Sequence, residues 1–177
     1  HAVTWNQEIS KAADQSTGHA KKEINPYAIL TPEEELETFE LAAGYVAELV
    51  ASEPMVQEPV LTVWDGNGAM YVAEMRSYMQ DENGTGTKTL RNGRIKKLVD
   101  LNGDGRMDKS TIFIDNLNLP RMILPLDDWI AVRETDTMDV VAYRDTDGDG
   151  IADESKMLYE RGPYSRNGPK TSVEHQE

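Results

Sequence analysis

Hydrophobic and polar residues alternate in short segments along most of the chain, which is typical of half-buried β-strands. The segments that read as strands are 45–50, 60–64, 69–73, 93–99, 110–114, 120–125, 127–132, 139–143 and 156–159. Residues 65–68 read Asp-Gly-Asn-Gly and predict a hairpin turn between two of these segments. Because short strands follow one another through polar connections, the pattern predicts an all-β fold.

One short helix is predicted before most of the strands, because Thr31 begins a typical helix start. Thr31 can cap the helix, Pro32 suits the first helical position, and Glu34 stands where a capping box needs a carboxylate. Residues 1–30 are mostly polar with little periodicity, so we expect an N-terminal arm there. We expect residues 31–177 to form one region in which the strands are assembled into β-sheets.

An acidic loop occurs twice and divides the strands into repeated units. Residues 100–108 and 145–153 both read D-x-[DN]-x-D-G-x-x-D and begin 45 residues apart. Each loop follows a predicted strand and leads into another, and a strand repeat of this length is typical of one β-propeller blade. We therefore expect about two blades from the N-terminal part of a β-propeller. Two blades cannot close a ring, so the remainder is expected on another chain or segment.

The side chains of these loops are those that calcium prefers, because calcium takes about six to eight oxygen ligands. The expected side-chain ligands are Asp100, Asn102, Asp104 and Asp108 in the first loop and Asp145, Asp147, Asp149 and Asp153 in the second. Backbone carbonyls of Arg106 and Ile151 are expected to complete the two sets, and Gly105 and Gly150 are expected where each loop turns sharply.

An EF-hand is excluded, because the flanking segments are strands and the twelfth loop position holds Thr111 or Lys156 instead of Glu. Without that bidentate ligand we expect weak calcium affinity, of the kind found in extracellular proteins. The alternative interpretation is a metal-free Asp/Gly hairpin, in which the Asp side chains accept backbone N–H groups.

The composition narrows the choice of partners. A net charge of -14 and a pI of about 4.6 argue against nucleic acid, because phosphate binding requires an excess of Lys and Arg. The absence of Cys excludes disulfides, thiolate zinc sites and c-type haem attachment within the chain. No apolar run has the length of a transmembrane helix.

The expected compartment is outside the cytoplasm. The chain starts at His1 instead of Met, as a mature secreted protein does after its signal is removed. Weak calcium loops also suit the higher calcium concentration outside cells. We therefore expect a secreted or periplasmic protein.

Several segments, taken in order, resemble one known family. They are 39–45, 48–57, 70–78, 93–95, the two acidic loops, 119–121 and 172–176. The set resembles the membrane-bound dehydrogenases of planctomycetes and related bacteria, which are similar to soluble quinoprotein glucose/sorbosone dehydrogenases. The resemblance covers about residues 30–177. It implies a six-bladed propeller when complete, with any membrane association made through another part of the protein.

The resemblance also implies a cofactor and a reaction. Such enzymes bind pyrroloquinoline quinone (PQQ) and oxidise a sugar or other alcohol, with a His that takes the hydroxyl proton as hydride passes to the quinone. His175 matches that motif, and Arg76 matches an Arg expected to hold the anionic quinone or substrate. A cytochrome c acceptor would need haem c from a separate domain or chain.

Two main functions therefore remain open. The first is the N-terminal portion of a secreted, calcium-stabilised quinoprotein-like dehydrogenase, with His175 as general base. The alternative is a non-catalytic β-propeller that binds carbohydrate or protein and uses calcium only as a staple; a calcium-repeat adaptor segment is a third interpretation. For Glu74 and Arg76, at the end of a predicted inner strand, the alternative to a site is a surface ion pair.

Overall fold

The computed structural model describes residues 29–78, 90–135 and 139–160. The chain divides into two compact units, His1–Glu48 and Leu49–Glu177. Helix α2 belongs to the first unit and all of the strands belong to the second, so each unit is considered by itself. None of the helices in the described ranges is long and apolar enough to cross a lipid bilayer.

Helix α2 (Pro32–Leu36) begins as the sequence predicts. The Thr31 hydroxyl accepts the N–H of Glu34 at 3.2 Å, and the Glu34 carboxylate accepts the N–H of Thr31 at 2.7 Å. This reciprocal pair is the predicted capping box, and it satisfies two N–H groups that a helix start leaves without partners. The helix is only 5 residues long and has no buried residue.

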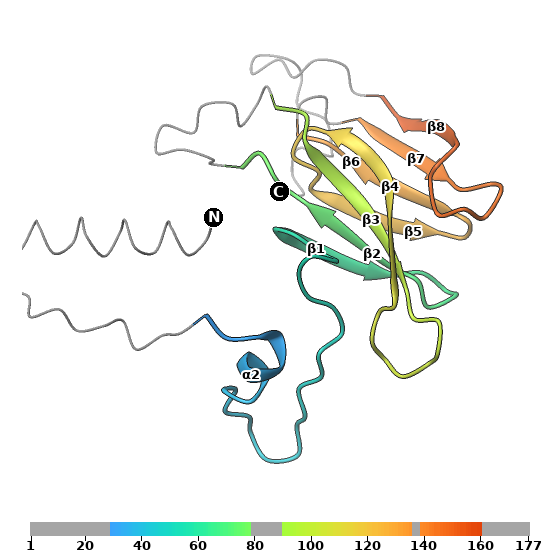
Figure 1. The fold of residues 1–177 in the computed structure, drawn as a ribbon. Coiled ribbons are helices and arrows are strands. Elements are labelled where there is room, and N and C mark those ends of the chain that lie inside the picture. Colours follow the sequence, from blue (N-terminus) through green and yellow to red (C-terminus); the bar gives the residue numbers. More distant parts are fainter. Residues whose placement is uncertain (1–28, 79–89, 136–138, 161–177) are drawn as a thin grey trace, which may run out of the picture. The chain divides into compact units, whose positions relative to one another are not determined.

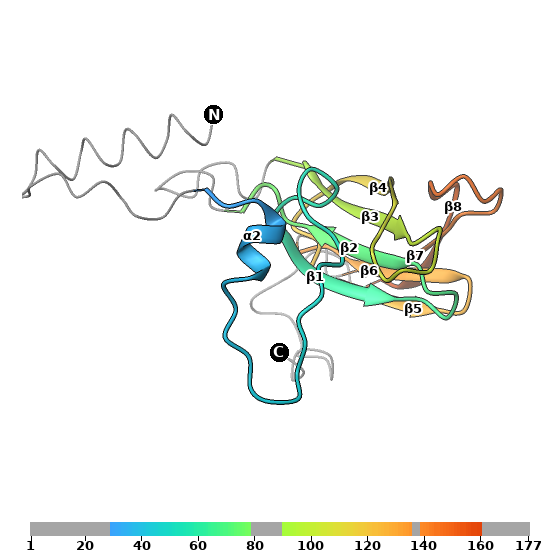
Figure 2. The same ribbon diagram turned by 60° about the horizontal axis from the view of Figure 1, so that its bottom comes forward.

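The second unit consists of two four-stranded antiparallel sheets, seen together in Figure 1 and Figure 2. The first sheet has the order β1 (Pro59–Trp64), β2 (Met70–Glu74), β3 (Gly93–Val99), β4 (Lys109–Leu117). The second sheet has the order β5 (Met122–Leu126), β6 (Trp129–Arg133), β7 (Val140–Arg144), β8 (Glu154–Tyr159). The predicted all-β class is confirmed, and each strand predicted between residues 60 and 159 is present, with both predicted ends for β3 and with ends shifted by up to three residues for the others.

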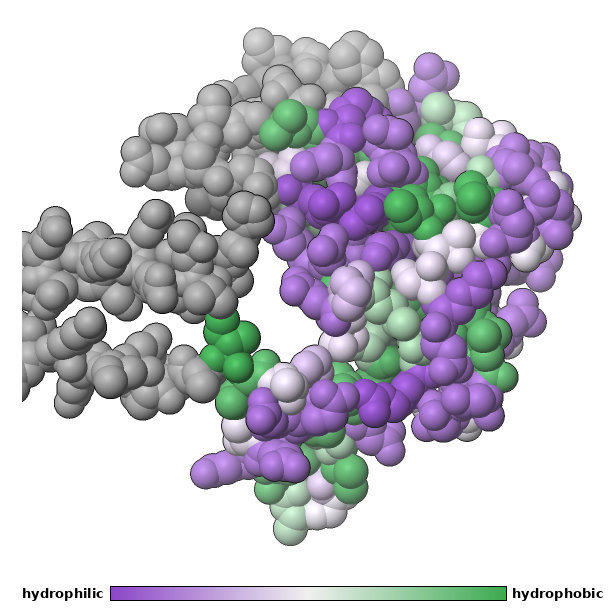
Figure 3. Space-filling view, viewed as in Figure 1, coloured by the Kyte–Doolittle hydropathy of each residue, from purple (hydrophilic) through white to green (hydrophobic). Residues whose placement is uncertain are grey.

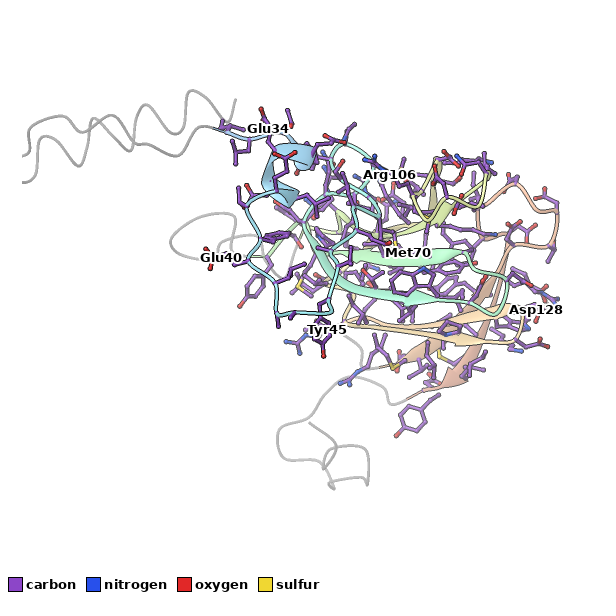
Figure 4. The ribbon with its side chains drawn as sticks, turned by 90° about the horizontal axis from the view of Figure 1, so that it is seen from below. Glu34, Glu40, Tyr45, Met70, Arg106 and Asp128 are labelled. Atoms are coloured by element: carbon purple, nitrogen blue, oxygen red, sulfur yellow. The ribbon has the colours of Figure 1, made fainter. Side chains whose placement is uncertain are left out.

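The strand predicted over 45–50 is wrong. These residues form no strand, and no described strand pairs with them. Tyr45, labelled in Figure 4, is 75% exposed and Val46 is 83% exposed. Sequence alone favours a strand here, but a strand also needs a neighbour to complete its hydrogen-bond ladder.

The two acidic-loop hairpins share one pairing register under a shift of 45 residues. The matched pairs are Val99–Lys109 with Arg144–Glu154, Leu98–Ser110 with Tyr143–Ser155, and Ile95–Ile114 with Val140–Tyr159. An irregularity in the ladder lies between Ile95 and Lys96, and it recurs between Val140 and Val141. The repeat seen in the sequence is therefore a repeat of backbone structure, irregularity included.

The main core lies between the facing sides of the two sheets. Its buried residues include Ala69, Tyr71, Ala73, Ile95, Phe113 and Leu117 from the first sheet and its turn, and Ile123, Ile130 and Val132 from the second sheet. The Tyr71 and Phe113 rings meet edge to face with centroids 5.1 Å apart. Such pairs add to the stabilisation that burial of the two rings supplies.

The opposite side of the first sheet is covered by the connection that leads into it. Met70, which Figure 4 labels on β2, forms a second core with Val72 and Leu98. Residues Val50, Ala51, Met55 and Val56 of this connection pack against that core. We call residues 49–57 the entry segment.

Strand β8 differs from its counterpart β4 in burial. Every residue of β8 is exposed, whereas Phe113 of β4 is only 2% exposed. Leu158, which is 45 residues after Phe113, is 44% exposed. Figure 3 shows that hydrophobic residues form patches on the otherwise mostly hydrophilic surface of this unit. Phe113 is buried in the main core, against which Ala152 of the second acidic loop also packs.

Candidate metal centre

The first acidic loop joins β3 to β4 and is organised around one carboxylate (Figure 1). Asp100 Oδ1 accepts the N–H groups of Asn102 at 3.1 Å and Gly103 at 2.7 Å, and its Oδ2 accepts the N–H of Gly105 at 2.8 Å. The hydrogen bonds from the N–H groups of Gly105 and Gly103 stabilise the ionised carboxylate, and they are the main reason that the pKa of Asp100 is below its ordinary value.

The second acidic loop joins β7 to β8 and repeats this arrangement. Asp145 Oδ1 accepts the N–H of Gly148 at 2.7 Å, and its Oδ2 accepts the N–H of Gly150 at 2.9 Å. Both glycines have positive φ, 81° and 96°, which few other residues adopt without strain. The sequence predicts the sharp turn at Gly150, while the left-handed conformation of Gly148 is an addition from the structure.

Three of the predicted calcium ligands come together in the second loop. Oxygen atoms of Asp145, Asp147 and Asp149 lie within 4.8 Å of one another. Asp147 and Asp149 each use Oδ1 to accept a backbone N–H of the loop, at 3.1 and 2.7 Å. Carboxylate oxygens at this spacing fit a hard cation such as calcium. The corresponding side chains of the first loop include the neutral amide of Asn102. The first loop therefore has a smaller negative charge at these three positions than the second loop.

The predicted ligands at the ninth loop position, Asp108 and Asp153, instead accept hydrogen bonds from within their own loops. Asp153 accepts both the N–H and the hydroxyl of Thr146, at 3.1 and 2.6 Å. Asp108 likewise accepts the N–H of Leu101 at 2.7 Å. In both loops the ninth residue therefore ties the loop back to its second residue. Within the described residues, the group of three carboxylates does not include Asp153.

The backbone carbonyls of Arg106 and Ile151 remain predicted ligands. The N–H of Arg106 donates to Asp104 Oδ1 at 2.8 Å, and the N–H of Ile151 donates to Asp149 Oδ1 at 2.7 Å. These bonds fix the backbone at the seventh position of each loop. Figure 4 labels Arg106 in the first loop.

Lys97 of β3 connects the second loop to the first sheet. Its Nζ lies 3.1 Å from Asp145 Oδ2, and the Asp145 side chain is only 5% exposed. Burial raises the pKa of Asp145, but the hydrogen bonds from Lys97, Gly148 and Gly150 outweigh it, so the pKa is lowered overall. The sequence gives no signal for Lys97, because the pair joins residues 48 positions apart.

A backbone hydrogen bond from the eighth position anchors each loop to the segment before it. The N–H of Ala152 donates to the carbonyl of Phe113 in β4 at 2.9 Å. In the first loop, the N–H of Met107 donates to the carbonyl of Val50 at 2.9 Å. Each acidic loop therefore supplies the predicted ligands and also contacts the preceding part of the chain.

Replacement of Gly150 by alanine is expected to lower the free energy of unfolding by about 2–3 kcal/mol. A Cβ atom at Gly150 would lie 3.0 Å from Thr111 Oγ1 and 3.2 Å from Thr111 Cβ, in addition to the strain of its positive φ. Urea unfolding followed by tryptophan fluorescence measures the loss.

Gly105→Ala is the matched control, because Gly105 has the same loop position, a φ of 88° and no atom within 4 Å of an added Cβ. It should cost about 1 kcal/mol, from backbone strain alone. Equal losses for the two variants would contradict close packing of the second loop on β4.

A buried carboxylate joins the first sheet to its entry segment. Glu74 is fully buried, and it accepts the N–H of Gln57 at 2.7 Å and the Arg94 Nε–H at 2.5 Å. Lys96 Nζ lies 3.6 Å from the same carboxylate. The interpretation of Glu74 as part of a surface ion pair is therefore wrong, since its side chain has no exposure to solvent.

Glu134 makes the equivalent connection for the second sheet. It follows β6 directly, and it accepts the N–H of Asn118 at 2.5 Å and a side-chain N–H of Arg91 at 2.8 Å. Glu74 and Glu134 thus each accept a backbone N–H from the connection that enters their own sheet. The sequence analysis singled out Glu74 but missed Glu134, because a Glu at a strand end carries no distinctive motif.

The residues of the predicted redox site are only partly described. His175, the predicted general base, lies outside the described residues, as do His1 and His19. Arg76 lies in the turn after β2, and its backbone carbonyl accepts the Asn92 Nδ2–H at 3.4 Å. The roles of His175 and Arg76, and binding of PQQ, therefore remain predictions.

Comparison with known proteins gives one family. A family model described as "Domain of unknown function (DUF7133)" matches residues 31–171. No curated protein and no solved structure gives a match. The matched region contains helix α2, both sheets and both acidic loops.

Proposed function

The chain belongs to the DUF7133 family, and we propose that its two sheets are consecutive β-propeller blades stapled by calcium. The shared pairing register under a shift of 45 residues supports the blade interpretation. Each sheet has four antiparallel strands in sequential order, as propeller blades do. The function of this part is then to provide a rigid scaffold for a binding or catalytic surface.

The group of Asp145, Asp147 and Asp149 is the observation that carries the calcium proposal. Three carboxylates within 4.8 Å repel one another, and the described cation that pairs with them is Lys97, which contacts only Asp145. A bound calcium ion would supply two positive charges and take oxygen ligands from all three side chains.

The placement of the loop explains why such an ion would act as a staple. Asp145 pairs with Lys97, and Ala152 donates to Phe113, so both ends of the loop contact the first sheet. Rigid positioning of the carboxylates between these two contacts would therefore stabilise the interface between the sheets. The first loop offers a weaker site, because Asn102 replaces one of the three carboxylates.

Calcium at about 10 mM is expected to stabilise the chain by about 1.4–2.7 kcal/mol, if its dissociation constant lies in the extracellular range of about 0.1–1 mM. Thermal unfolding followed by circular dichroism should then show a melting temperature several degrees higher. Chelation should reverse the change.

Asp149→Asn removes one charge from the group and should abolish most of this increase. Asp127→Asn is the matched control, because Asp127 is an exposed turn residue outside both loops whose φ of 59° Asn tolerates. The calcium proposal is overturned if calcium leaves the melting temperature unchanged, or raises it equally in the Asp149→Asn variant.

A further inference from the structure

A hollow lies between the entry segment and strands β3 and β4 of the first sheet. Its volume is about 360 Å³, at the small end of the range that small-molecule sites have. The lining residues combine apolar side chains, two cations and one hydroxyl, without an acid among them: Pro54, Met55, Arg94, Lys96, Ser110 and Ile112. The hollow therefore offers an apolar side and a positively charged side.

The two cations of the hollow share a single carboxylate. Arg94 Nε donates to Glu74 Oε2 at 2.5 Å, and Lys96 Nζ lies 3.6 Å from Glu74 Oε1. Among the described residues, no other carboxylate forms an ion pair with either cation. The Arg94 and Lys96 side chains are only 13% and 10% exposed, so water screens their charges weakly. One positive charge beside the hollow is therefore left without a counter-ion.

Both cations also have hydrogen-bond donors to spare, because a guanidinium carries five N–H groups and an ammonium carries three. Arg94 uses its Nε–H on Glu74 and an Nη2–H on Gln57, at 3.1 Å, and Nη1 has no acceptor among the described residues. Lys96 Nζ donates to the Met55 carbonyl at 2.6 Å. An anion in the hollow would find donors as well as an opposite charge.

The repeated hairpin does not require these cations. Lys96 and Val141 are equivalent under the shift of 45 residues, and their strand partners are also 45 residues apart. Arg94 corresponds in the same way to Asp139. The second hairpin therefore forms with an apolar residue and an acid where the first has two cations. The positive charge belongs to the hollow and not to the architecture of the hairpin.

We propose that this hollow binds a small monocarboxylate that has a short apolar chain. The carboxylate balances the remaining positive charge and accepts N–H groups of Arg94 and Lys96, since a guanidinium matches a carboxylate in shape and charge. The apolar chain lies against Pro54, Met55 and Ile112. A phosphate dianion fits less well, because it brings more charge than the hollow has left over and leaves the apolar side uncovered.

Sodium butyrate is the probe, and its binding is measured by NMR titration of the isotope-labelled 177-residue chain at constant ionic strength. Saturable shifts are expected for the amides of Met55, Lys96 and Ser110, with a dissociation constant on the order of 1 mM. Butanol and butylammonium have the same chain length without the negative charge, and they should bind at least about tenfold more weakly. Shifts that do not saturate, or equal binding of butanol, overturn the proposal.

Two substitutions test the two sides of the hollow. Lys96→Met removes the remaining charge and leaves Arg94 to pair with Glu74, and it should raise the butyrate dissociation constant about tenfold. Ile112→Trp fills the apolar side without removing the ion pair, and it should weaken binding as strongly. Leu124→Trp is the matched control, because Leu124 is a strand residue of β5 that is 48% exposed and lies outside the lining. Unchanged binding in the first two variants, or an equal loss in the control, contradicts the proposed site.

The same carboxylate chemistry could come from a free acid or from a side chain of another protein segment, and we assign it to a free acid. Ligand-observed NMR on the protein purified from its natural source, after dialysis, separates the two. A site for a free acid binds butyrate there as it does in the isolated chain. Loss of binding in the natural protein shows that a protein carboxylate fills the hollow, and the assignment is then wrong. The proposal does not depend on calcium, so chelation should change none of these results.

Discussion

Glu74→Ala is expected to lower the free energy of unfolding by about 3–5 kcal/mol, because it leaves a buried ion pair without its carboxylate. Glu74 is fully buried, while the Arg94 and Lys96 side chains that meet it are 13% and 10% exposed. The backbone N–H of Gln57 also loses its acceptor. Urea unfolding followed by circular dichroism measures the change.

Glu154→Ala is the matched control for this substitution. Glu154 also pairs with an arginine, Arg144, but its side chain is 46% exposed and water can solvate the charges that remain. The expected loss is less than about 1 kcal/mol. Similar losses for the two variants would show that Glu74 contributes no more than a surface ion pair.

Phe113→Ala is expected to lower the free energy of unfolding by about 3–5 kcal/mol, through the loss of apolar burial and the cavity that remains. Phe113 is 2% exposed, packs edge to face on Tyr71, and lies where β4 receives the second acidic loop. Urea unfolding measures the loss as a lower midpoint, while the slope of the unfolding free energy against urea concentration stays unchanged.

Leu158→Ala provides a control at the equivalent place of the repeat. Leu158 lies 45 residues after Phe113 in the other hairpin, but it is 44% exposed. We expect a loss below about 1 kcal/mol, as for most surface positions. A large effect at Leu158 would mean that β8 is covered in solution, and would contradict its exposure here.

Much of the second unit was predictable from the sequence, because its strands carry local signals. The strand Gly93–Val99 has the predicted ends, and the acidic loops that follow it and β7 fix the 45-residue repeat. Asp145, Asp147 and Asp149 were predicted ligands that the loop does bring together. Both results depend on residues that are close together in the sequence.

The remaining features depend on contacts between distant segments. The Lys97 pair with Asp145 and the burial of Glu74 arise only when sheets and connections meet, and neither residue carries a motif. The error over 45–50 has the same cause, since strand-type sequence does not say whether a pairing strand is present. The predicted His175 chemistry depends on residues that the structure does not describe.

The backward direction of the loop contacts has a consequence for the order of folding. Val50 precedes Met107, and Phe113 precedes Ala152, so each loop binds a carbonyl that has already been synthesised when the loop is made. During synthesis, each hairpin can therefore dock on a surface that is already complete. The second sheet can be assembled on the first as a template, without waiting for residues still to be translated.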